Sequence, residues 1–383
     1  MKIAFIPATF LPTIGGSEIQ AHNLANKICE KHHIDIYLLN YTNLKNIRYK
    51  IKFLPKIIIN LVYLFKYYFN LDFTIIYKIY FINLIKKKSY DIWHFHSLNY
   101  KTLLFAKVLK SLNQKIIITF QGADIQIDKK INYGYRLKKK YNDLFQIVVR
   151  KADRFIAISD NIKKDLELLN IDNSKIEKIP NSVSRDRINN TGLKKFNEFT
   201  ILTVGRYAEK KKGFDLVKKI SKHLLKKIHF KWIIIGRNTS ELLKKNFFKI
   251  NKKNFLILDQ IENNKDLLFP NDTLIKYYKK SHVYANLARL ESFGVTIIEA
   301  MASFLPIVSF RTKGADELII HKKNGFFISD NNYSNFAKIL IRIKKNKNIY
   351  KSVFKFNSKY IKEYDLKITS KKTINLYKNV INN

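Results

Sequence analysis

Two carboxylates flank an expected helix start in the stretch RLESFGVTIIEAMAS, Glu291 before it and Glu299 within it. The run HVYANLA before this stretch reads as a strand, and FGVTIIEAMAS reads as a helix. The first turn of a helix leaves backbone N–H groups unpaired and carries about half a positive charge, which favours an anion such as phosphate. We therefore expect four residues to hold phosphate through their backbone: Phe293, Gly294, Val295 and Thr296.

A bound diphosphate at this helix would place the two glutamates near its two ends. Carboxylates accept hydrogen bonds from hydroxyl groups, and a nucleotide-sugar carries a sugar on one side of its diphosphate and a ribose on the other. The alternative is a solvated helix face with an acid that compensates the helix dipole. It suits Glu299 poorly, because apolar residues (297–298 and 300–302) surround it in the chain.

A basic motif, GRYAEKKKG, follows the expected strand at 199–205. Arg206 leaves the strand end, and Lys212 comes six residues later, beside Gly213. A planar guanidinium and a mobile ammonium together suit a diphosphate, which spreads its charge over several oxygens. Chance proximity is the alternative in a chain with 72 Lys and Arg, but the position at a strand end favours a functional pair.

Two series of short apolar runs, each followed by a helical pattern, predict two parallel sheets and an α/β fold. A polar segment without clear periodicity (182–198) separates them as a linker would, and 349–382 reads as helices. Open α/β sheets bind ligands at the carboxyl ends of their strands, so we expect the site in a cleft between the sheets. The predicted strands are 2–7, 34–40, 91–96, 115–120, 154–159 and 175–180, then 199–205, 230–236, 254–259, 282–288, 306–310 and 325–329.

The composition is strongly basic, with 72 Lys and Arg against 30 Asp and Glu and a net charge of +42. Such a charge attracts anions, whether nucleic acid, nucleotide-sugar or an acidic membrane face. AT-rich codons are the competing explanation, since they inflate Lys together with Ile, Asn, Phe and Tyr. The single Cys29 excludes an intramolecular disulfide and the N-terminus lacks a signal-peptide pattern, so we expect a cytoplasmic protein.

Residues 53–88 are rich in apolar and aromatic side chains that are interrupted by Lys56, Lys66, Asp72 and Lys78. No uninterrupted run reaches the roughly 18 residues that a membrane-spanning helix needs. Aromatic residues mixed with lysines suit helices that lie in the headgroup layer of a membrane. Two ordinary amphipathic helices packed on a sheet explain the segment equally well.

The first strand is followed by PTIGGSEIQ, in which Gly15 and Gly16 precede an expected helix. Such a loop lets the backbone approach an anion at the helix start, although a plain turn and helix cap explain it equally well. His96 ends the third predicted strand, where it is either a ligand-side residue or a packed histidine. No cluster of metal-ligating residues stands out in the sequence.

The chain resembles the retaining nucleotide-sugar glycosyltransferases of glycosyltransferase family 4, which have the GT-B fold. The motifs run in family order over nearly the whole chain, and the spaced glutamate pair with the Arg and Lys motif is specific. They are GGSE (15–18), TFQGAD (119–124), IPNSV (179–183), GRYAEKKKG (205–213), ESFGVTIIEAMA (291–302), GADELI (314–319) and NGFF (324–327).

The resemblance implies a role for each matching residue. Arg206 and Lys212 would bind the donor diphosphate, Glu299 the ribose and Glu291 the donor sugar, which makes Arg206, Lys212 and Glu291 the expected catalytic group. Gly16 would approach the phosphates from the first domain. The expected acceptor-side residues are Gly15, His96, Gln121 and Asp124.

One position departs from the family pattern. Many members have His where this chain has Gln121, so the resemblance gives this position no acid–base role, although an amide hydrogen bond to the sugar stays feasible. The resemblance also implies two Rossmann-like domains facing across a cleft, without metal or cofactor. We expect an acceptor-side domain (1–185), a linker (186–198), a donor-binding domain (199–360) and a C-terminal helix (361–383) that crosses back to the first domain.

The expected function is transfer of a hexosyl group from a nucleoside-diphosphate sugar to a glycan or lipid-linked acceptor with retention of configuration. Biosynthesis of a bacterial surface polysaccharide (lipopolysaccharide, O-antigen or capsule) is the expected context. A peripheral position of the protein on the inner face of the cytoplasmic membrane is compatible with the expected cytoplasmic location. Another GT-B enzyme, such as a nucleotide-sugar epimerase, is an alternative. A nucleic-acid binder is disfavoured, because the charge is spread along the chain and no reading motif appears.

Overall fold

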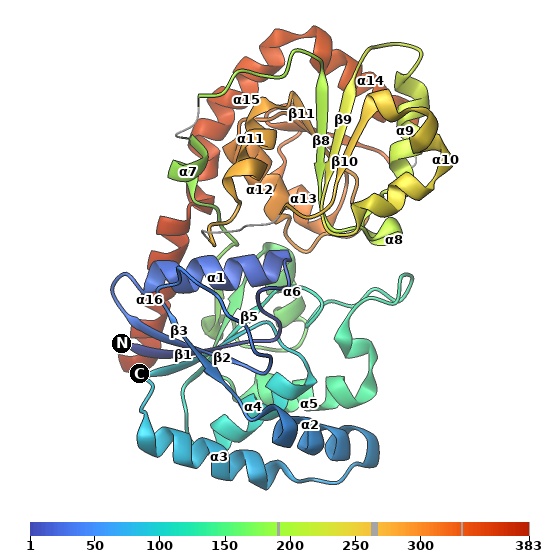
Figure 1. Ribbon diagram of the computed structural model, residues 1–383. Coiled ribbons are helices and arrows are strands. Elements are labelled where there is room, and N and C mark those ends of the chain that lie inside the picture. The colour runs from blue at the N-terminus through green and yellow to red at the C-terminus, as the bar shows by residue number, and fades with distance from the viewer. Residues whose placement is uncertain (190–191, 262–266, 331, 383) are drawn as a thin grey trace. The chain divides into compact units, whose positions relative to one another are not determined.

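The computed structural model describes residues 1–189, 192–261, 267–330 and 332–382, which form two compact units. Unit 1 contains Met1–Pro180 and the chain from Thr369 onward, and unit 2 contains Asn181–Ile368. Each unit is built on one parallel sheet with helices on both faces (Figure 1). The predicted α/β fold with two parallel sheets is confirmed.

The sheet of unit 1 has seven parallel strands in the order β3-β2-β1-β4-β5-β6-β7. Figure 1 shows α1 (Gly16–Ile28) on one face of this sheet, with α3 (Thr74–Lys87), α4 (Tyr100–Ser111) and α5 (Lys139–Lys151) on the other. All six strands predicted for this unit are present. The strands are β1 (Lys2–Pro7), β2 (His33–Leu38), β3 (Lys50–Phe53), β4 (Ile92–His96), β5 (Ile116–Phe120), β6 (Arg154–Ala157) and β7 (Ile176–Lys178).

Strand β3 is a seventh strand that the sequence pattern did not predict. It has only four residues, KIKF, and it lies at the sheet edge, where it pairs with β2. Its residues are exposed or half-buried. A short edge strand that carries lysines has little of the apolar signal by which buried parallel strands are recognised.

The last helix, α16 (Leu366–Asn382), contributes to the core of unit 1. The Tyr377 hydroxyl lies 2.5 Å from Nδ1 of the buried His94, whose Nε2 lies 2.7 Å from Oγ1 of Thr119. Burial holds the pKa of His94 well below its usual value, so the ring is neutral. Lys115 donates to two carbonyls at the C-terminal end of α16, those of Val380 (2.8 Å) and Ile381 (2.7 Å), where a cation also favours the helix dipole.

The sheet of unit 2 has six parallel strands in the order β10-β9-β8-β11-β12-β13, and all six were predicted. Its core includes Trp232, whose indole N–H donates to Oγ1 of Thr203 at 3.1 Å. The strands are β8 (Thr200–Val204), β9 (Lys231–Ile235), β10 (Phe255–Leu258), β11 (Val283–Asn286), β12 (Ile307–Phe310) and β13 (Gly325–Ile328). The main helices are α9 (Asp215–Leu224), α11 (Asp272–Lys280), α12 (Val295–Ala302), α13 (Lys313–Leu318), α14 (Tyr333–Lys345) and α15 (Lys347–Tyr360).

The described part of the expected linker (186–189 and 192–198) belongs to unit 2. It includes most of a short helix, α7 (Arg185–Asn189), and Arg187 pairs with Asp272 at 2.6 Å. Just before this helix, the backbone N–H of Val183 donates to the carbonyl of Tyr364 at 3.0 Å. The chain between the two sheets is therefore packed, with hydrogen bonds that the polar sequence did not reveal.

The apolar segment at 53–88 forms α2 (Lys56–Leu64), a π-helical turn (Phe65–Phe69) and α3 in unit 1. Two helices were expected here, and two are present. Within the described ranges, no helix has the length and apolar character needed to cross a bilayer.

The contact of Tyr377 with His94 predicts a specific loss of stability. Tyr377→Phe leaves a buried ring nitrogen without its partner, so we expect the free energy of unfolding to fall by about 1 to 3 kcal/mol. Urea denaturation measures this change. Tyr41→Phe is the matched control, because Tyr41 is 78% exposed, and an equal effect of the two substitutions would contradict this role of Tyr377.

Candidate functional site

Arg206 lies where β8 ends, at the carboxyl edge of the unit 2 sheet. Beyond the end of β8, the backbone remains hydrogen-bonded to the end of β9 and the residues after it. Gly205 N–H donates to the Ile235 carbonyl (2.9 Å), and Tyr207 N–H donates to the Arg237 carbonyl (2.8 Å). The side chain of Arg206 is exposed and has no ion-pair partner in the described part of the chain. An anion can therefore reach its guanidinium.

Lys212 ends the short helix α8 (Glu209–Lys212), and Gly213 follows it with a left-handed backbone, φ 69°. A Cβ atom at Gly213 would clash with the carbonyl oxygen of Leu287, in the loop after β11. Only glycine lets these two backbones approach so closely in that conformation. The Lys-Gly pair noted in the sequence thus brings the loops after β8 and β11 together.

A second contact between the same loops was missed by sequence reasoning. Arg289 makes a bidentate ion pair with Asp215, with both N–O distances 2.7 Å, and its backbone N–H donates to the Lys211 carbonyl at 2.9 Å. The partners are 74 positions apart. No sequence spacing indicates such a pair, although the planar fork of arginine suits it.

Glu291 and Lys212 form an ion pair, with 2.5 Å between Oε2 and Nζ. The backbone of Glu291 is held as well, because Gly314 N–H donates to its carbonyl at 2.9 Å. A Cβ atom at Gly314 would lie only 2.6 Å from both N and O of Phe293. The loop that carries Glu291 is therefore seated against the start of α13, and Glu291 is in contact with Lys212.

Helix α12 begins at Val295, after Gly294 with φ 106°. The backbone N–H groups of Ile297 and Ile298 both donate to the Gly294 carbonyl, and they are the first in this helix to be hydrogen-bonded within the backbone. For Val295 and Thr296, no acceptor of the backbone N–H is present among the residues the structure describes. These two groups point along the helix axis at its positive end and suit an anion.

Phe293 differs from its neighbours in what it can offer a ligand. Its side chain is buried and its ring lies 6.0 Å from that of Tyr364. Only the backbone of Phe293 is therefore available at the helix start.

Glu299 is nearly fully buried in α12, and its Oε2 accepts the Tyr278 hydroxyl at 2.8 Å. Burial raises the pKa of Glu299 to about 7, and the hydrogen bond from Tyr278 opposes that rise only in part. Tyr278 lies on α11 and was not identified from the sequence. This carboxyl group changes its charge near neutral pH.

Several charged groups lie close to Lys211. Burial, together with the nearby charges of Lys212 and Arg206, lowers the pKa of the Lys211 ammonium to about 8, although Glu291 opposes the fall. Three cations that repel one another in this way are stabilised by a bound anion. With the start of α12, they can hold a diphosphate and oppose negative charge that grows on it.

In unit 1, His96 and Gln121 lie together at the carboxyl ends of β4 and β5. The Gln121 amide nitrogen is 2.9 Å from Nε2 of His96, and the Phe5 ring stacks on His96 with 5.8 Å between centroids. Burial lowers the pKa of His96 to about 3, although the Ser17 backbone opposes the fall. His96 is thus a neutral, packed histidine that orients Gln121 and is a weak base at neutral pH.

Asp124 is fully buried and holds the loop backbone around it. Its carboxylate accepts N–H groups of Gly122 (2.8 Å), Gln121 (3.1 Å) and Leu98 (3.2 Å). Burial raises the pKa of Asp124 to about 6 despite these hydrogen bonds. The geometry makes Asp124 a positioning residue for the loop that carries Gln121.

Gly15 is the residue before α1, and Gly16 begins that helix. The backbone of Gly15 is extended, and a Cβ there would lie 2.6 Å from a carboxylate oxygen of Glu18. Glu18 also accepts the Thr9 hydroxyl at 2.5 Å. The Gly15 backbone therefore packs closely against the carboxylate of Glu18, which lies in the first turn of α1.

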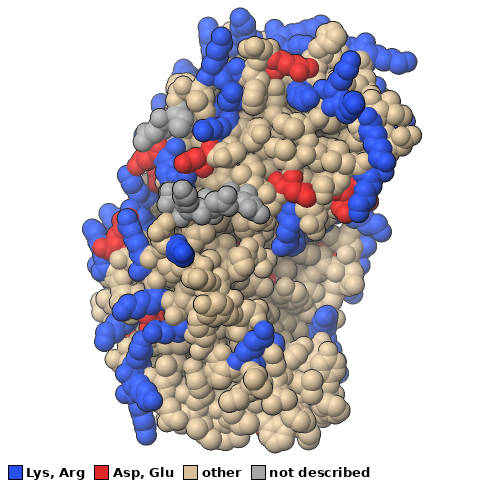
Figure 2. Space-filling model, viewed as in Figure 1, with Lys and Arg blue, Asp and Glu red and all other residues tan. Residues whose placement is uncertain are grey.

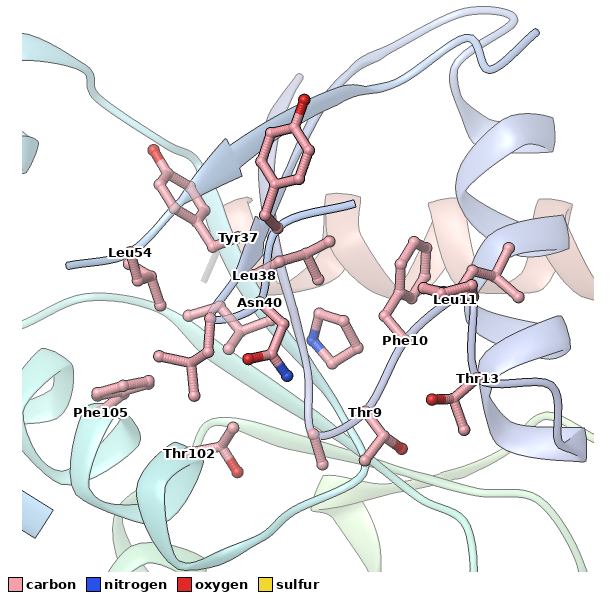
Figure 3. A pocket seen from close by; sticks show the side chains of 16 residues that line it. Thr9, Phe10, Leu11, Thr13, Tyr37, Leu38, Asn40, Leu54, Thr102 and Phe105 are labelled. Atoms are coloured by element: carbon pink, nitrogen blue, oxygen red, sulfur yellow. The ribbon is translucent and has the colours of Figure 1, made fainter. Parts of the chain in front are cut away.

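A cavity of about 150 Å³ lies beside this loop, at the carboxyl ends of β1 and β2. Figure 3 shows apolar side chains such as Phe10, Leu54 and Phe105 in its lining, together with the amide of Asn40 and the hydroxyl of Thr102. It can hold a small group that has an apolar face and a hydroxyl.

Over the ranges that the structure describes, no three His, Cys, Asp or Glu residues are grouped so that they could bind a metal ion.

Two family models match the chain and together span most of it. Residues 14–187 match "Glycosyltransferase Family 4", and residues 184–360 match "Glycosyl transferases group 1". An uncharacterized glycosyltransferase of Methanocaldococcus jannaschii is 25% identical over 366 residues, which are 95% of this chain and 94% of that protein.

Two solved structures show the same fold. Anabaena Alr3699/HepE, solved in complex with UDP-glucose, has a TM-score of 0.74 at 14% identity and covers 99% of this chain and 100% of its own. WaaG, a glycosyltransferase involved in lipopolysaccharide biosynthesis, has a TM-score of 0.70 at 14% identity and covers 98% of this chain and 99% of its own.

The raised pKa of Glu299 predicts a pH-dependent stability. Well below about pH 4.5 the carboxyl is protonated in both states. Between about pH 4.5 and about pH 7 the unfolded chain releases this proton while the folded protein keeps it, so stability falls as pH rises, and above about pH 7 both states are ionised. We expect the free energy of unfolding of the wild type, relative to Glu299→Gln, to fall by about 3 kcal/mol between about pH 4 and about pH 8. Urea denaturation of both proteins measures it. A difference that does not change with pH would contradict the burial of an ionisable Glu299.

Proposed function

Because the chain is a glycosyltransferase of the family 4 type, with a group 1 C-terminal domain and the GT-B fold, we propose that it transfers a hexosyl group from a nucleoside-diphosphate sugar to a hydroxyl group. The single observation that carries the donor assignment is that the charges of Arg206, Lys212 and Glu291 all lie near Lys211. These cations lie in unit 2, which also contains the unpaired N–H groups at the start of α12. This arrangement suits a diphosphate.

The donor would lie along this arrangement. Arg206, Lys212 and the backbone from Gly294 to Thr296 would bind the diphosphate, with Gly16 assigned to the phosphates as well. Glu299 would accept ribose hydroxyls through Oε1, and Glu291 would contact the donor sugar. The likeness to a fold that binds UDP-glucose in HepE supports a nucleotide-sugar as donor.

Transfer requires the bond between the anomeric carbon and the diphosphate oxygen to break, with the electron pair leaving on that oxygen. Arg206, Lys212 and the N–H groups of Val295 and Thr296 would stabilise the charge that develops there. Lys212 can do so without losing Glu291, because an ammonium has three N–H donors. The ion pair with Glu291 would then aim the lysine at the phosphate.

Retention of configuration and independence from metal belong to the same proposal. The carboxylate nearest the cations, Glu291, is engaged by Lys212, which makes it a poor nucleophile for a double displacement. We favour attack by the acceptor hydroxyl on the face from which the diphosphate leaves. Its proton would pass to the departing phosphate oxygen, so the step needs no separate protein base.

The acceptor side is assigned to unit 1, with Gln121, Gly15, His96 and Asp124. Gln121 would offer its amide to a sugar hydroxyl, while His96 and Asp124 hold it in place. A glycan or lipid-linked oligosaccharide in surface polysaccharide synthesis is the proposed acceptor. The likeness to WaaG, which takes part in lipopolysaccharide biosynthesis, supports this context.

The assignment of Arg206 predicts a large loss of transfer without loss of the fold. We expect Arg206→Ala to lower the rate of sugar transfer by about 10²-fold or more, because the charge on the leaving diphosphate loses a donor. The measurement is turnover with the donor that gives the largest thermal stabilisation in a screen of nucleotide-sugars. Circular dichroism shows whether the variant is folded.

Arg150→Ala is the matched control, because Arg150 is an exposed arginine on α5, in unit 1. It should keep wild-type turnover. Wild-type turnover of Arg206→Ala would refute the donor assignment, and conversion of a donor without any acceptor would favour an epimerase.

A further inference from the structure

One part of unit 1 exposes an unusual number of large apolar side chains. We call it the α2–α3 face, and it comprises the outward residues of α2, of the π-helical turn, of the loop after it and of α3. On α2 they recur at helical spacing, so they share one side of the helix. The members are Ile57, Ile58, Leu61, Leu64, Tyr68, Phe69, Leu71, Phe73, Ile75, Ile76 and Ile79, all exposed.

The same two helices bury a different set of side chains. Ile59 and Val62 of α2 and Tyr77 and Phe81 of α3 are almost fully buried, and the Tyr77 hydroxyl donates to the Ile59 carbonyl at 2.7 Å. Packing on unit 1 is therefore already satisfied by the inner side of each helix. A helix that is apolar on both sides needs a second apolar environment for its outer side.

Charged residues in this segment are mostly positive. Residues 53–89 contain six lysines and one aspartate, and that aspartate, Asp72, is paired with Lys66 at 3.1 Å. In Figure 2 the surface over α2 and α3 is largely without charged side chains, and lysine or arginine side chains lie at its margin. Nearby aromatic residues, Tyr63 and Tyr67, stack with 5.3 Å between ring centroids.

We propose that the α2–α3 face docks on a lipid bilayer that contains anionic phospholipid. Apolar side chains would enter the boundary between headgroups and acyl chains, and the lysines would contact the anionic headgroups. Tyrosines suit this boundary because they carry an apolar ring and a polar tip. The helices lie along the bilayer surface in this arrangement and do not cross it.

Two partners could cover the α2–α3 face, a lipid bilayer or a second copy of this chain, and the charge of the face favours the bilayer. A second copy that presents the same face would bring lysines against lysines with few acids to pair them, which disfavours the contact. An anionic bilayer complements both the apolar centre and the basic margin. The ordinary amphipathic helices that the sequence also allowed would keep their outer sides polar, and these do not.

Lipid binding by the α2–α3 face does not require that the protein transfers sugars. The biological role that we give to this binding rests on the proposed function. A lipid-linked acceptor would be presented at the bilayer surface, where the docked enzyme would meet it. Lipid binding and donor binding can be measured separately. Failure of one therefore leaves the other open to test.

The test is co-sedimentation of the full-length protein with phosphatidylcholine vesicles, with and without phosphatidylglycerol. We expect binding to the anionic vesicles that weakens with added salt, and a roughly tenfold weaker binding by the double variant Ile57→Ser, Leu61→Ser. Ile250→Ser is the matched control, since Ile250 is 73% exposed on unit 2 and Ile57 is 77% exposed. The control should bind as the wild type does.

A charge variant separates the two contributions. Lys86→Gln with Lys87→Gln should weaken binding to anionic vesicles, whereas the exposed pair Lys252→Gln with Lys253→Gln on unit 2 should not. Equal binding by the wild type and the Ile57, Leu61 variant would overturn the proposal, as would no binding at low salt. A wild-type dimer in sedimentation velocity that the same variant dissociates would instead assign the face to a second copy. Thermal stabilisation by the donor should be the same in all variants.

Discussion

The proposed donor site depends on positive charges that lie close together in unit 2. Lys211 lies near the charges of Lys212, Glu291 and Arg206, Lys212 is paired with Glu291, and the start of α12 adds further positive potential. Mutual repulsion of this kind costs stability in the free protein, so it persists only where surrounding structure enforces it. Binding of the proposed diphosphate would relieve the repulsion and would couple affinity and catalysis to the same charges.

The enforcing structure is largely backbone. Gly213 lets the loop after β8 touch the loop after β11, and Gly314 lets the start of α13 touch the loop that carries Glu291. The bidentate pair of Arg289 with Asp215 closes the same loops from the side. Three loops from three strand ends are thus held to one another, so the cations and the helix start keep their positions before a ligand arrives.

Much of this arrangement follows from local sequence, and the rest does not. The strands were predictable because buried parallel strands are short apolar runs. Lys212 and Glu291 were grouped in the sequence by the family resemblance, and their ion pair was not predicted. The pair of Arg289 with Asp215 and the bond of Tyr278 to Glu299 join residues on different elements, and no spacing rule predicts them. The outward side of α2 and α3 was ambiguous in the sequence, since apolar residues on both sides of a helix do not say which side is buried. Residues 186–198 read as a linker because their polar side chains hide backbone contacts such as that of Phe196 N–H with the Lys280 carbonyl.

The central claim is that unit 2 recognises the diphosphate of its donor. Isothermal titration calorimetry of matched pairs, each a nucleoside diphosphate and its nucleoside, tests this directly. For the cognate base the account predicts that the diphosphate binds at least roughly a hundredfold more tightly than the nucleoside, with an advantage that shrinks as salt rises. Equal affinity of nucleoside and nucleoside diphosphate for every base would contradict it.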